Sequence, residues 1–157
     1  MPGDPFLEED FRVLTPEAFD FVLNNELKRA VRSQNFLTLL VVEPMPRPHA
    51  PLVDRGRAVR QVARIVSREV RETDLLSQTA EGRLSVVLLD ADMPNSLRVV
   101  DRLLSRFEHY EFPTPLTIEV GAACCPTHGA DADSLRRAAE ARPVHRRDDR
   151  GNASNAQ

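Results

Sequence analysis

Apolar positions in the first third of the chain follow a helical period and then a strand pattern. Thr15 is a suitable N-cap for a helix that has Pro16 at its first position. The apolar residues on one face of that helix are Phe19, Val22, Leu23, Leu27, Ala30 and Val31. Residues 36–42 (FLTLLVV) are almost continuously apolar, which predicts a strand buried on both faces. The extended connection after this strand is predicted by Pro44, Pro46, Pro48 and Pro51.

The rest of the chain alternates short strands with three further helical patterns. A helix over residues 57–71 is predicted by the spacing of Val59, Val62, Val66 and Val70. Residues 74–79 and 84–89 indicate two strands joined by a hairpin turn at 80–83. The helix predicted after Pro94 has an apolar face of Leu97, Val100, Leu104 and Phe107. The last predicted features are a strand over 116–125, a turn at His128 and Gly129, and a helix from about Ser134 to Pro143.

The order of these elements defines the expected fold. The centre of the chain reads β-α-β-β-α-β, the pattern of a ferredoxin-like sheet with helices on one face. We therefore predict an α+β fold with a ferredoxin-like core, an added N-terminal helix and an added C-terminal helix. The folded domain is expected over residues 13–145, after a flexible arm at 1–12 and before a disordered tail at 146–157.

Composition narrows the range of functions. The 157 residues include 21 basic and 24 acidic side chains, a net charge of −3 that does not favour nucleic acid or an anionic membrane as a partner. No apolar run approaches the length of a membrane span, and the acidic N-terminal region is not typical of a signal peptide. Cys124 and Cys125 are neighbours that cannot link distant segments, which favours a reducing cytoplasm.

The residue types that most often carry chemistry show no motif of their own. His49, His109, His128 and His145 lack metal-ligand spacing and are expected in loops or on the surface. Cys124 and Cys125 lie in an apolar strand, where they are expected to be small buried side chains. The chain has no phosphate-binding loop, zinc pattern or nucleophile motif. No catalytic residue, metal site or cofactor is therefore predicted.

Several segments resemble the GGDEF family of diguanylate cyclase domains. RETDLLSQTAEGRLSVVLLDAD is similar to the central hairpin of that family, in which an RxxD pair precedes the signature turn by five residues. LTIEVGAACCPTHGADADSL is similar to its late strand and turn, and LTPEAF and ELKRAVR resemble its opening helix. The resemblance covers about residues 14–142 and implies a nucleotide cyclase-like form of the predicted fold.

The family's enzymes join two GTP molecules into cyclic di-GMP with metal ions held by two carboxylates, while two turn glycines let the backbone approach the phosphates. Here Ala80 and Glu81 stand in the glycine positions, and Gly82 replaces one metal carboxylate. Glu43 matches the other metal carboxylate but is expected to be vestigial. Residues 46–57 (PRPHAPLVDRGR) are too short to contain the family's guanine-reading loop. We therefore expect a degenerate member without cyclase activity.

The resemblance also implies that Arg71 and Asp74 form the RxxD pair that binds the product. A guanidinium can donate to guanine O6 and N7, and a carboxylate can accept from the hydrogens on N1 and N2. The alternative interpretation is an ordinary salt bridge at a helix end. The same spacing occurs twice more, at Arg98/Asp101 and Arg146/Asp149, so only position distinguishes the first pair.

Two functions of different classes follow from these observations. The first is a catalytically inactive regulatory protein that senses cyclic di-GMP through Arg71 and Asp74. The second is a nucleotide-free module on the same fold, whose partner is another protein or a second copy of the chain. The first predicts nucleotide binding that Arg71→Ala abolishes, and the second predicts a protein partner that this variant retains.

Overall fold

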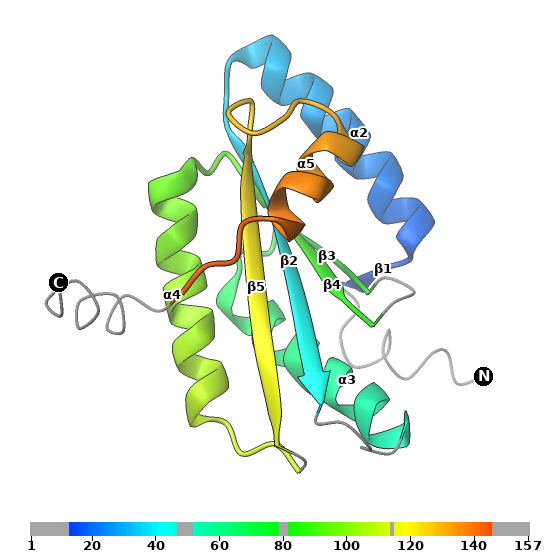
Figure 1. The fold of residues 1–157 in the computed structure, drawn as a ribbon. Coiled ribbons are helices and arrows are strands. Elements are labelled where there is room, and N and C mark those ends of the chain that lie inside the picture. Colours follow the sequence, from blue (N-terminus) through cyan, green and yellow to red (C-terminus); the bar gives the residue numbers. More distant parts are fainter. Residues whose placement is uncertain (1–12, 47–51, 79–81, 114, 146–157) are drawn as a thin grey trace, which may run out of the picture.

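The structure, a computed structural model, describes residues 13–46, 52–78, 82–113 and 115–145. A five-stranded sheet runs through the molecule, with helices on both of its faces (Figure 1). The strands lie in the order β1-β3-β4-β2-β5, and every neighbouring pair is antiparallel except β1 with β3. The elements in chain order are β1 (Val13–Leu14), α2 (Pro16–Ser33), β2 (Leu37–Pro46), α3 (Leu52–Glu69), β3 (Leu75–Gln78), β4 (Leu84–Leu89), α4 (Met93–His109), β5 (Leu116–Cys125) and α5 (Ala132–Glu140).

The central elements form the ferredoxin-like core that the sequence predicts. β2, α3, β3, β4, α4 and β5 follow in β-α-β-β-α-β order, and the crossovers place β2 between β4 and β5. Helices α3 and α4 pack on one face of the sheet, and α2 and α5 pack on the other (Figure 1). The predicted α+β class, with one helix added at each end, is confirmed.

Successive residues of β2 point into two separate cores. Leu40 and Val42 pack under α3 and α4, whereas Leu39 and Val41 pack under α2 and α5. The apolar run of this strand is continuous because helices cover both faces of the sheet. β4 and β5 have their predicted bounds, 84–89 and 116–125.

β2 is longer than predicted, because Pro44 and Pro46 lie inside the strand. Beyond Val42 the strand pairs only with β5, since β4 begins at Leu84, the partner of Val42. A strand edge tolerates proline, because a missing N–H on its open side removes no ladder hydrogen bond. The rest of the predicted connection, residues 47–51, lies outside the described part of the chain and includes Pro48, His49 and Pro51.

Helix α2 begins as predicted but buries a narrower stripe. The Thr15 hydroxyl accepts a hydrogen bond from the Ala18 N–H at 3.2 Å, and Pro16 occupies the first turn. The buried residues are Phe19, Leu23, Leu27 and Ala30. Val31, which was expected on this face, is 50% exposed. It lies about 40° around the helix beyond Leu27, at the margin of the stripe that meets the sheet.

The sequence pattern does not reveal β1. This strand has two residues, which pair in parallel with Leu76 and Ser77 of β3. Two residues are too few for an alternation of apolar and polar positions to be recognised. Among the helices that the structure describes, none combines the length and hydropathy that crossing a membrane requires.

The hairpin predicted at the centre of the chain is present, because β3 and β4 pair in antiparallel fashion with Gln78 opposite Leu84. Ala80 and Glu81, in its turn, lie outside the described residues. The arm predicted at 1–12 and the tail predicted at 146–157 also lie outside them, so both stay predictions.

Helix α5 packs closely over β5 at Gly121. A Cβ atom at this residue would lie 1.9 Å from the carbonyl oxygen of Ala139, a distance that no side chain can accept. The chain after α5 then runs along the edge of β5, where the Val144 N–H donates to the Val120 carbonyl at 2.8 Å. Glycine at this position therefore allows α5 to approach the sheet.

Candidate functional site

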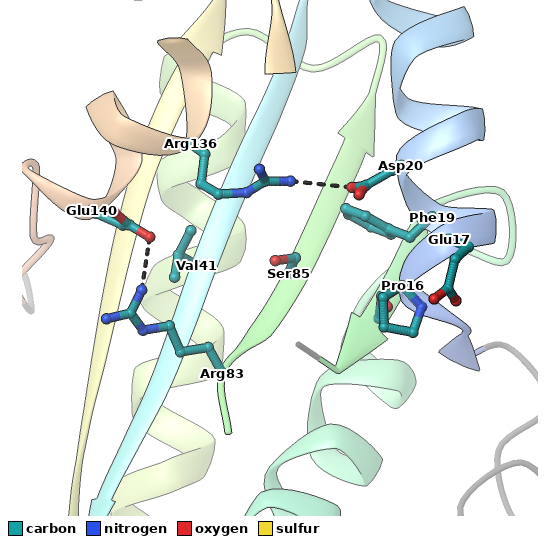
Figure 2. Close-up of a pocket in the computed structure, with 10 residues that line it drawn as sticks. Pro16, Glu17, Phe19, Asp20, Val41, Arg83, Ser85, Arg136 and Glu140 are labelled. Atoms are coloured by element: carbon teal, nitrogen blue, oxygen red, sulfur yellow. Dashed lines mark hydrogen bonds and ion pairs between the residues drawn. The ribbon is translucent and has the colours of Figure 1, made fainter. Parts of the chain in front are cut away.

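Arg83 joins the beginning of β4 to β2 and α5. It follows Gly82, whose φ of +79° is a conformation that glycine adopts without steric cost. The Nε atom of Arg83 lies 3.5 Å from the carboxylate of Glu43. Its Nη1 atom lies 2.8 Å from the carboxylate of Glu140 (Figure 2). A guanidinium thus lies beside the carboxylate that the sequence resemblance assigns to a metal.

This guanidinium reduces the negative charge around Glu43 of β2. Glu119 of β5 is the cross-strand neighbour of Glu43, so two carboxylates lie on adjacent strands at this point. Within the described ranges, no three His, Cys, Asp or Glu side chains are placed to hold one metal ion. Among the described residues, Glu43 forms an ion pair with Arg83. The proposed role of Ala80 and Glu81 in the turn stays a prediction.

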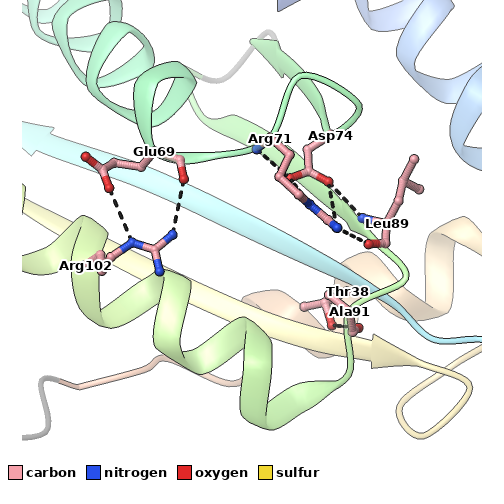
Figure 3. A network of polar contacts seen from close by, with 7 residues as sticks. All are labelled: Thr38, Glu69, Arg71, Asp74, Leu89, Ala91 and Arg102. Atoms are coloured by element: carbon pink, nitrogen blue, oxygen red, sulfur yellow. Dashed lines mark hydrogen bonds and ion pairs between the residues drawn. The ribbon is translucent and has the colours of Figure 1, made fainter.

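Asp74 organises the turn between α3 and β3. Its Oδ2 atom accepts a hydrogen bond from the backbone N–H of Arg71 at 2.9 Å, and the Asp74 N–H donates to the Arg71 carbonyl at 3.0 Å. Its Oδ1 atom accepts from the backbone N–H of Leu89, at the end of β4, at 3.0 Å. Figure 3 shows these contacts of the Asp74 carboxylate. The side chain is only 2% exposed. One buried carboxylate therefore ties the turn to a neighbouring strand.

Arg71 lies over the same carboxylate but extends into solvent. Its Nε and Nη2 atoms lie 3.5 and 3.4 Å from the two oxygens of Asp74, and Nη2 also donates to the carbonyl of Leu89. Its side chain is 60% exposed, in contrast to that of its partner. The predicted pair is thus brought together as an ion pair, in which the guanidinium is exposed and the carboxylate is buried.

Leu89 is a third member of this network, and the sequence gives no sign of its part in it. Both its N–H and its carbonyl bind the Arg71/Asp74 pair, 15 or more residues away in the chain (Figure 3). Backbone groups carry no sequence signal of their own, and only the pairing of β3 with β4 brings this residue near the turn.

The other RxxD matches have different surroundings. Arg98 and Asp101 both lie within α4, away from any turn between elements. The third match, Arg146/Asp149, lies outside the described residues. Arg71 and Asp74 are therefore the described pair that stands at a junction of a helix and a strand.

The two cysteines are buried, as predicted. Burial raises the pKa of both Cys124 and Cys125, which keeps the thiols protonated and unreactive near neutral pH. Cys125 belongs to the core under α2 and α5. These residues therefore contribute to packing rather than to a reactive site.

His128 has a structural contact at the end of β5. Its ring atom Nδ1 accepts a hydrogen bond from the backbone N–H of Cys124 at 2.9 Å, and the backbone N–H of His128 donates to the Cys124 carbonyl at 2.7 Å. Burial, with a smaller effect of the Arg142 charge, lowers the pKa of His128. A neutral imidazole suits this contact, because Nδ1 must be unprotonated to accept. His109 lies in the last turn of α4, with Nδ1 2.8 Å from the Ser105 carbonyl oxygen.

Comparison with known proteins identifies the fold. No protein-family model and no curated protein matches the sequence. The GGDEF domain of FimX from Pseudomonas aeruginosa has a TM-score of 0.75 at 16% identity, over 90% of this chain and 90% of that chain. The diguanylate cyclase SiaD from Pseudomonas aeruginosa, solved with its activator SiaC, has a TM-score of 0.68 at 17% identity, over 88% of this chain and 55% of that chain.

A third structure, of a microbial GGDEF domain interacting with cyclic di-GMP, has a TM-score of 0.62 at 21% identity, over 88% of this chain and 87% of that chain. All three identities are low, so the likeness is one of three-dimensional structure. It agrees with the order of strands, the two helical layers and the central hairpin described above. The chain has the fold of the GGDEF domains of diguanylate cyclases.

Proposed function

We propose that this chain is a catalytically inactive, GGDEF-like regulatory domain that binds cyclic di-GMP through Arg71. The observation that carries the binding proposal is the exposed guanidinium of Arg71, held in place by Asp74 and Leu89. The proposal locates the domain in the cytoplasm, on the argument from its two adjacent cysteines.

The ion pair between Arg83 and Glu43 supports the absence of cyclase activity. Diguanylate cyclase chemistry requires metal ions beside the triphosphates, and these need anionic ligands. Gly82 supplies no carboxylate, and the guanidinium of Arg83 lies 3.5 Å from the remaining one. A metal ion at Glu43 would have to compete with the guanidinium of Arg83, which is part of the same chain and already lies beside the carboxylate.

The geometry of Arg71 supports nucleotide binding. A guanidinium fixed by a buried carboxylate loses little conformational freedom when it donates to a base, because its position is already defined. Asp74 has both oxygens engaged with the protein, so we assign base recognition to Arg71 and a positioning role to Asp74. A microbial GGDEF domain of the same fold, 21% identical, interacts with cyclic di-GMP, which makes this nucleotide the first ligand to test.

Calorimetric titration with cyclic di-GMP tests the binding proposal. The parent chain is expected to bind with micromolar or tighter affinity, and Arg71→Ala to weaken binding by about 10- to 100-fold, the value of charge-assisted hydrogen bonds. Arg98→Ala is the matched control, because it removes the arginine of another RxxD pair in the middle of α4. Absence of heat from the parent chain, or equal losses in the two variants, would contradict the proposal.

Incubation with GTP and either magnesium or manganese tests the absence of catalysis. We expect no cyclic di-GMP in the products, with an active GGDEF enzyme measured in parallel as the positive control. Product formed by the parent chain would show that the hairpin still supports the reaction.

An alternative function is a nucleotide-free interaction module, with a protein partner or a second copy of the chain. Two apolar side chains on α2 favour it, because Phe21 is 69% exposed and Val31 is 50% exposed. SiaD, which has the same fold, was solved in complex with a protein activator.

Affinity capture with the parent chain, Phe21→Asp and Arg71→Ala discriminates the two functions. A partner lost only with Phe21→Asp favours the alternative, and one lost only with Arg71→Ala favours the nucleotide sensor.

A further inference from the structure

A cleft of about 370 Å³ lies on the face of the sheet that α2 and α5 cover (Figure 2). Its floor is formed by three strands, with Val41 from β2, Ser77 from β3 and Ser85 from β4. The first turns of α2 form one wall, and α5 together with Arg83 forms the other. Its volume lies in the range of small-molecule sites.

The floor of the cleft carries a hydroxyl group that faces the space where a ligand would lie. Ser85 is 3% exposed and points into the cleft (Figure 2). Its cross-strand neighbour Ser77 donates to the carbonyl of Leu14 at 2.9 Å. Among the described residues, by contrast, none forms a hydrogen bond with the Ser85 hydroxyl. A hydroxyl at the floor of a cleft, without a hydrogen-bond partner among the described residues, can both donate to a ligand and accept from it.

The two walls of the cleft differ in charge. The α2 wall carries the carboxylates of Glu17 and Asp20, whereas the opposite wall carries the guanidiniums of Arg83 and Arg136 and the carboxylate of Glu140. The Arg136 Nη2 atom lies 3.2 Å from Asp20 across the cleft (Figure 2). The cleft therefore has an acidic side and an opposite side that carries both of its guanidiniums.

We propose that this cleft binds a small zwitterion with one carboxylate and one ammonium group, the chemistry of a free amino acid. The ligand carboxylate accepts hydrogen bonds from the Ser85 hydroxyl and the two guanidiniums, and its ammonium group faces Asp20 and Glu17. A ligand with only a negative charge would be repelled by the three carboxylates that line the cleft. A ligand with only a positive charge would be repelled by the two guanidiniums. A zwitterion places each of its charges beside the opposite one.

Titration of the full chain, followed by heteronuclear NMR, tests the proposal with defined probes. Glycine, glutamate, lysine and phenylalanine sample small, acidic, basic and aromatic side chains. Propionate and propylamine each carry one of the two charges and serve as controls. We expect saturable shifts at cleft residues with at least one amino acid, and none with either control at the same concentration. Equal binding of propionate, or no shift with any amino acid, would overturn the proposal.

Variants then locate the binding. Ser85→Ala preserves the volume of the side chain and is expected to weaken binding about tenfold, the value of one hydrogen bond to a charged group. Arg136→Gln, the second variant, is expected to weaken it at least as much. Arg102→Gln is the control, because this arginine pairs with Glu69 on the opposite face of the sheet. Unchanged affinity in both cleft variants would contradict the assignment. Arg71→Ala should leave amino acid binding intact, which separates this proposal from that of nucleotide sensing.

Discussion

At the scale of single residues, Arg71 and Asp74 differ in the roles that we propose for them, although the RxxD spacing alone would make both of them ligand-binding residues. The carboxylate of Asp74 is 2% exposed and accepts backbone hydrogen bonds from Arg71 and Leu89. A carboxylate already engaged in this way would have to break those bonds before it could accept hydrogens from a base. Under the proposed function, the guanidinium of Arg71, which is 60% exposed, meets the base, and Asp74 acts through the position that it gives to Arg71.

Replacing Asp74 tests its structural role. Asp74→Ala leaves the backbone N–H groups of Arg71 and Leu89 without their acceptor and removes a buried carboxylate, and we expect the free energy of unfolding to fall by about 2–4 kcal/mol. Denaturation by urea, followed by circular dichroism, measures this loss. Glu72→Ala, in the same turn but with an exposed side chain, is the control and should change stability by less than about 0.5 kcal/mol. Similar losses in both variants would show that the turn does not depend on the carboxylate.

At the scale of elements, the position of α5 depends on one glycine of β5. The carbonyl oxygen of Ala139 approaches Gly121 so closely that any side chain there would displace the helix. α5 carries Arg136 and Glu140, which line the cleft, and Glu140 also pairs with Arg83. The packing of this helix on the sheet therefore shapes both the cleft and the surroundings of Glu43.

Adding a methyl group at Gly121 tests this packing. Gly121→Ala is expected to lower the free energy of unfolding by about 1–3 kcal/mol or more, because the clash is with backbone. Gly56→Ala is the matched control: its Cβ would meet only Arg60 Nη1 at an ordinary 3.7 Å. Since Gly56 lies within α3, this change should raise stability by about 0.5–1 kcal/mol. Thermal unfolding of both variants and the parent chain measures these changes in stability. A Gly121→Ala variant as stable as the parent chain would contradict the packing argument.

At the scale of the whole molecule, stability should depend on pH through His128. The folded chain holds this imidazole neutral, with a pKa below the ordinary value of 6.5 that applies when the chain is unfolded. Its contribution is therefore complete above pH 6.5 and is lost as the pH falls below that value towards the lower folded pKa. Hydrogen bonds from Ser134 lower the pKa of the N-cap Asp131 below its ordinary value of 3.8. The effect of Asp131 on stability is therefore lost only at a more acidic pH than that of His128.

Urea denaturation at a series of pH values between about 8 and about 5 measures this dependence. We expect the free energy of unfolding of the parent chain to decline through the lower half of that range. His128→Gln cannot take up a proton and should show a smaller decline over the same interval. Identical pH profiles for the two proteins would show that His128 does not contribute.

The order and type of nearly all the elements follow from the sequence, because helical and strand periods are local properties of the chain. β4 and β5 could be placed to the residue, since turn signals flank their apolar runs. The end of β2 could not, because prolines end a strand in the interior of a sheet but not at an edge. Only the strand order shows that Pro44 and Pro46 lie at such an edge.

The candidate sites show the same division. From sequence alone, spacing places Arg71 and Asp74 together in a turn, and Glu43 at the end of a strand. Tertiary structure decides that Asp74 is buried against Leu89, that Arg83 reaches Glu43 and Glu140, and that Ser85 forms the floor of a cleft. These contacts join residues far apart in the chain, so they depend on strand pairing and helix packing, which no local pattern encodes.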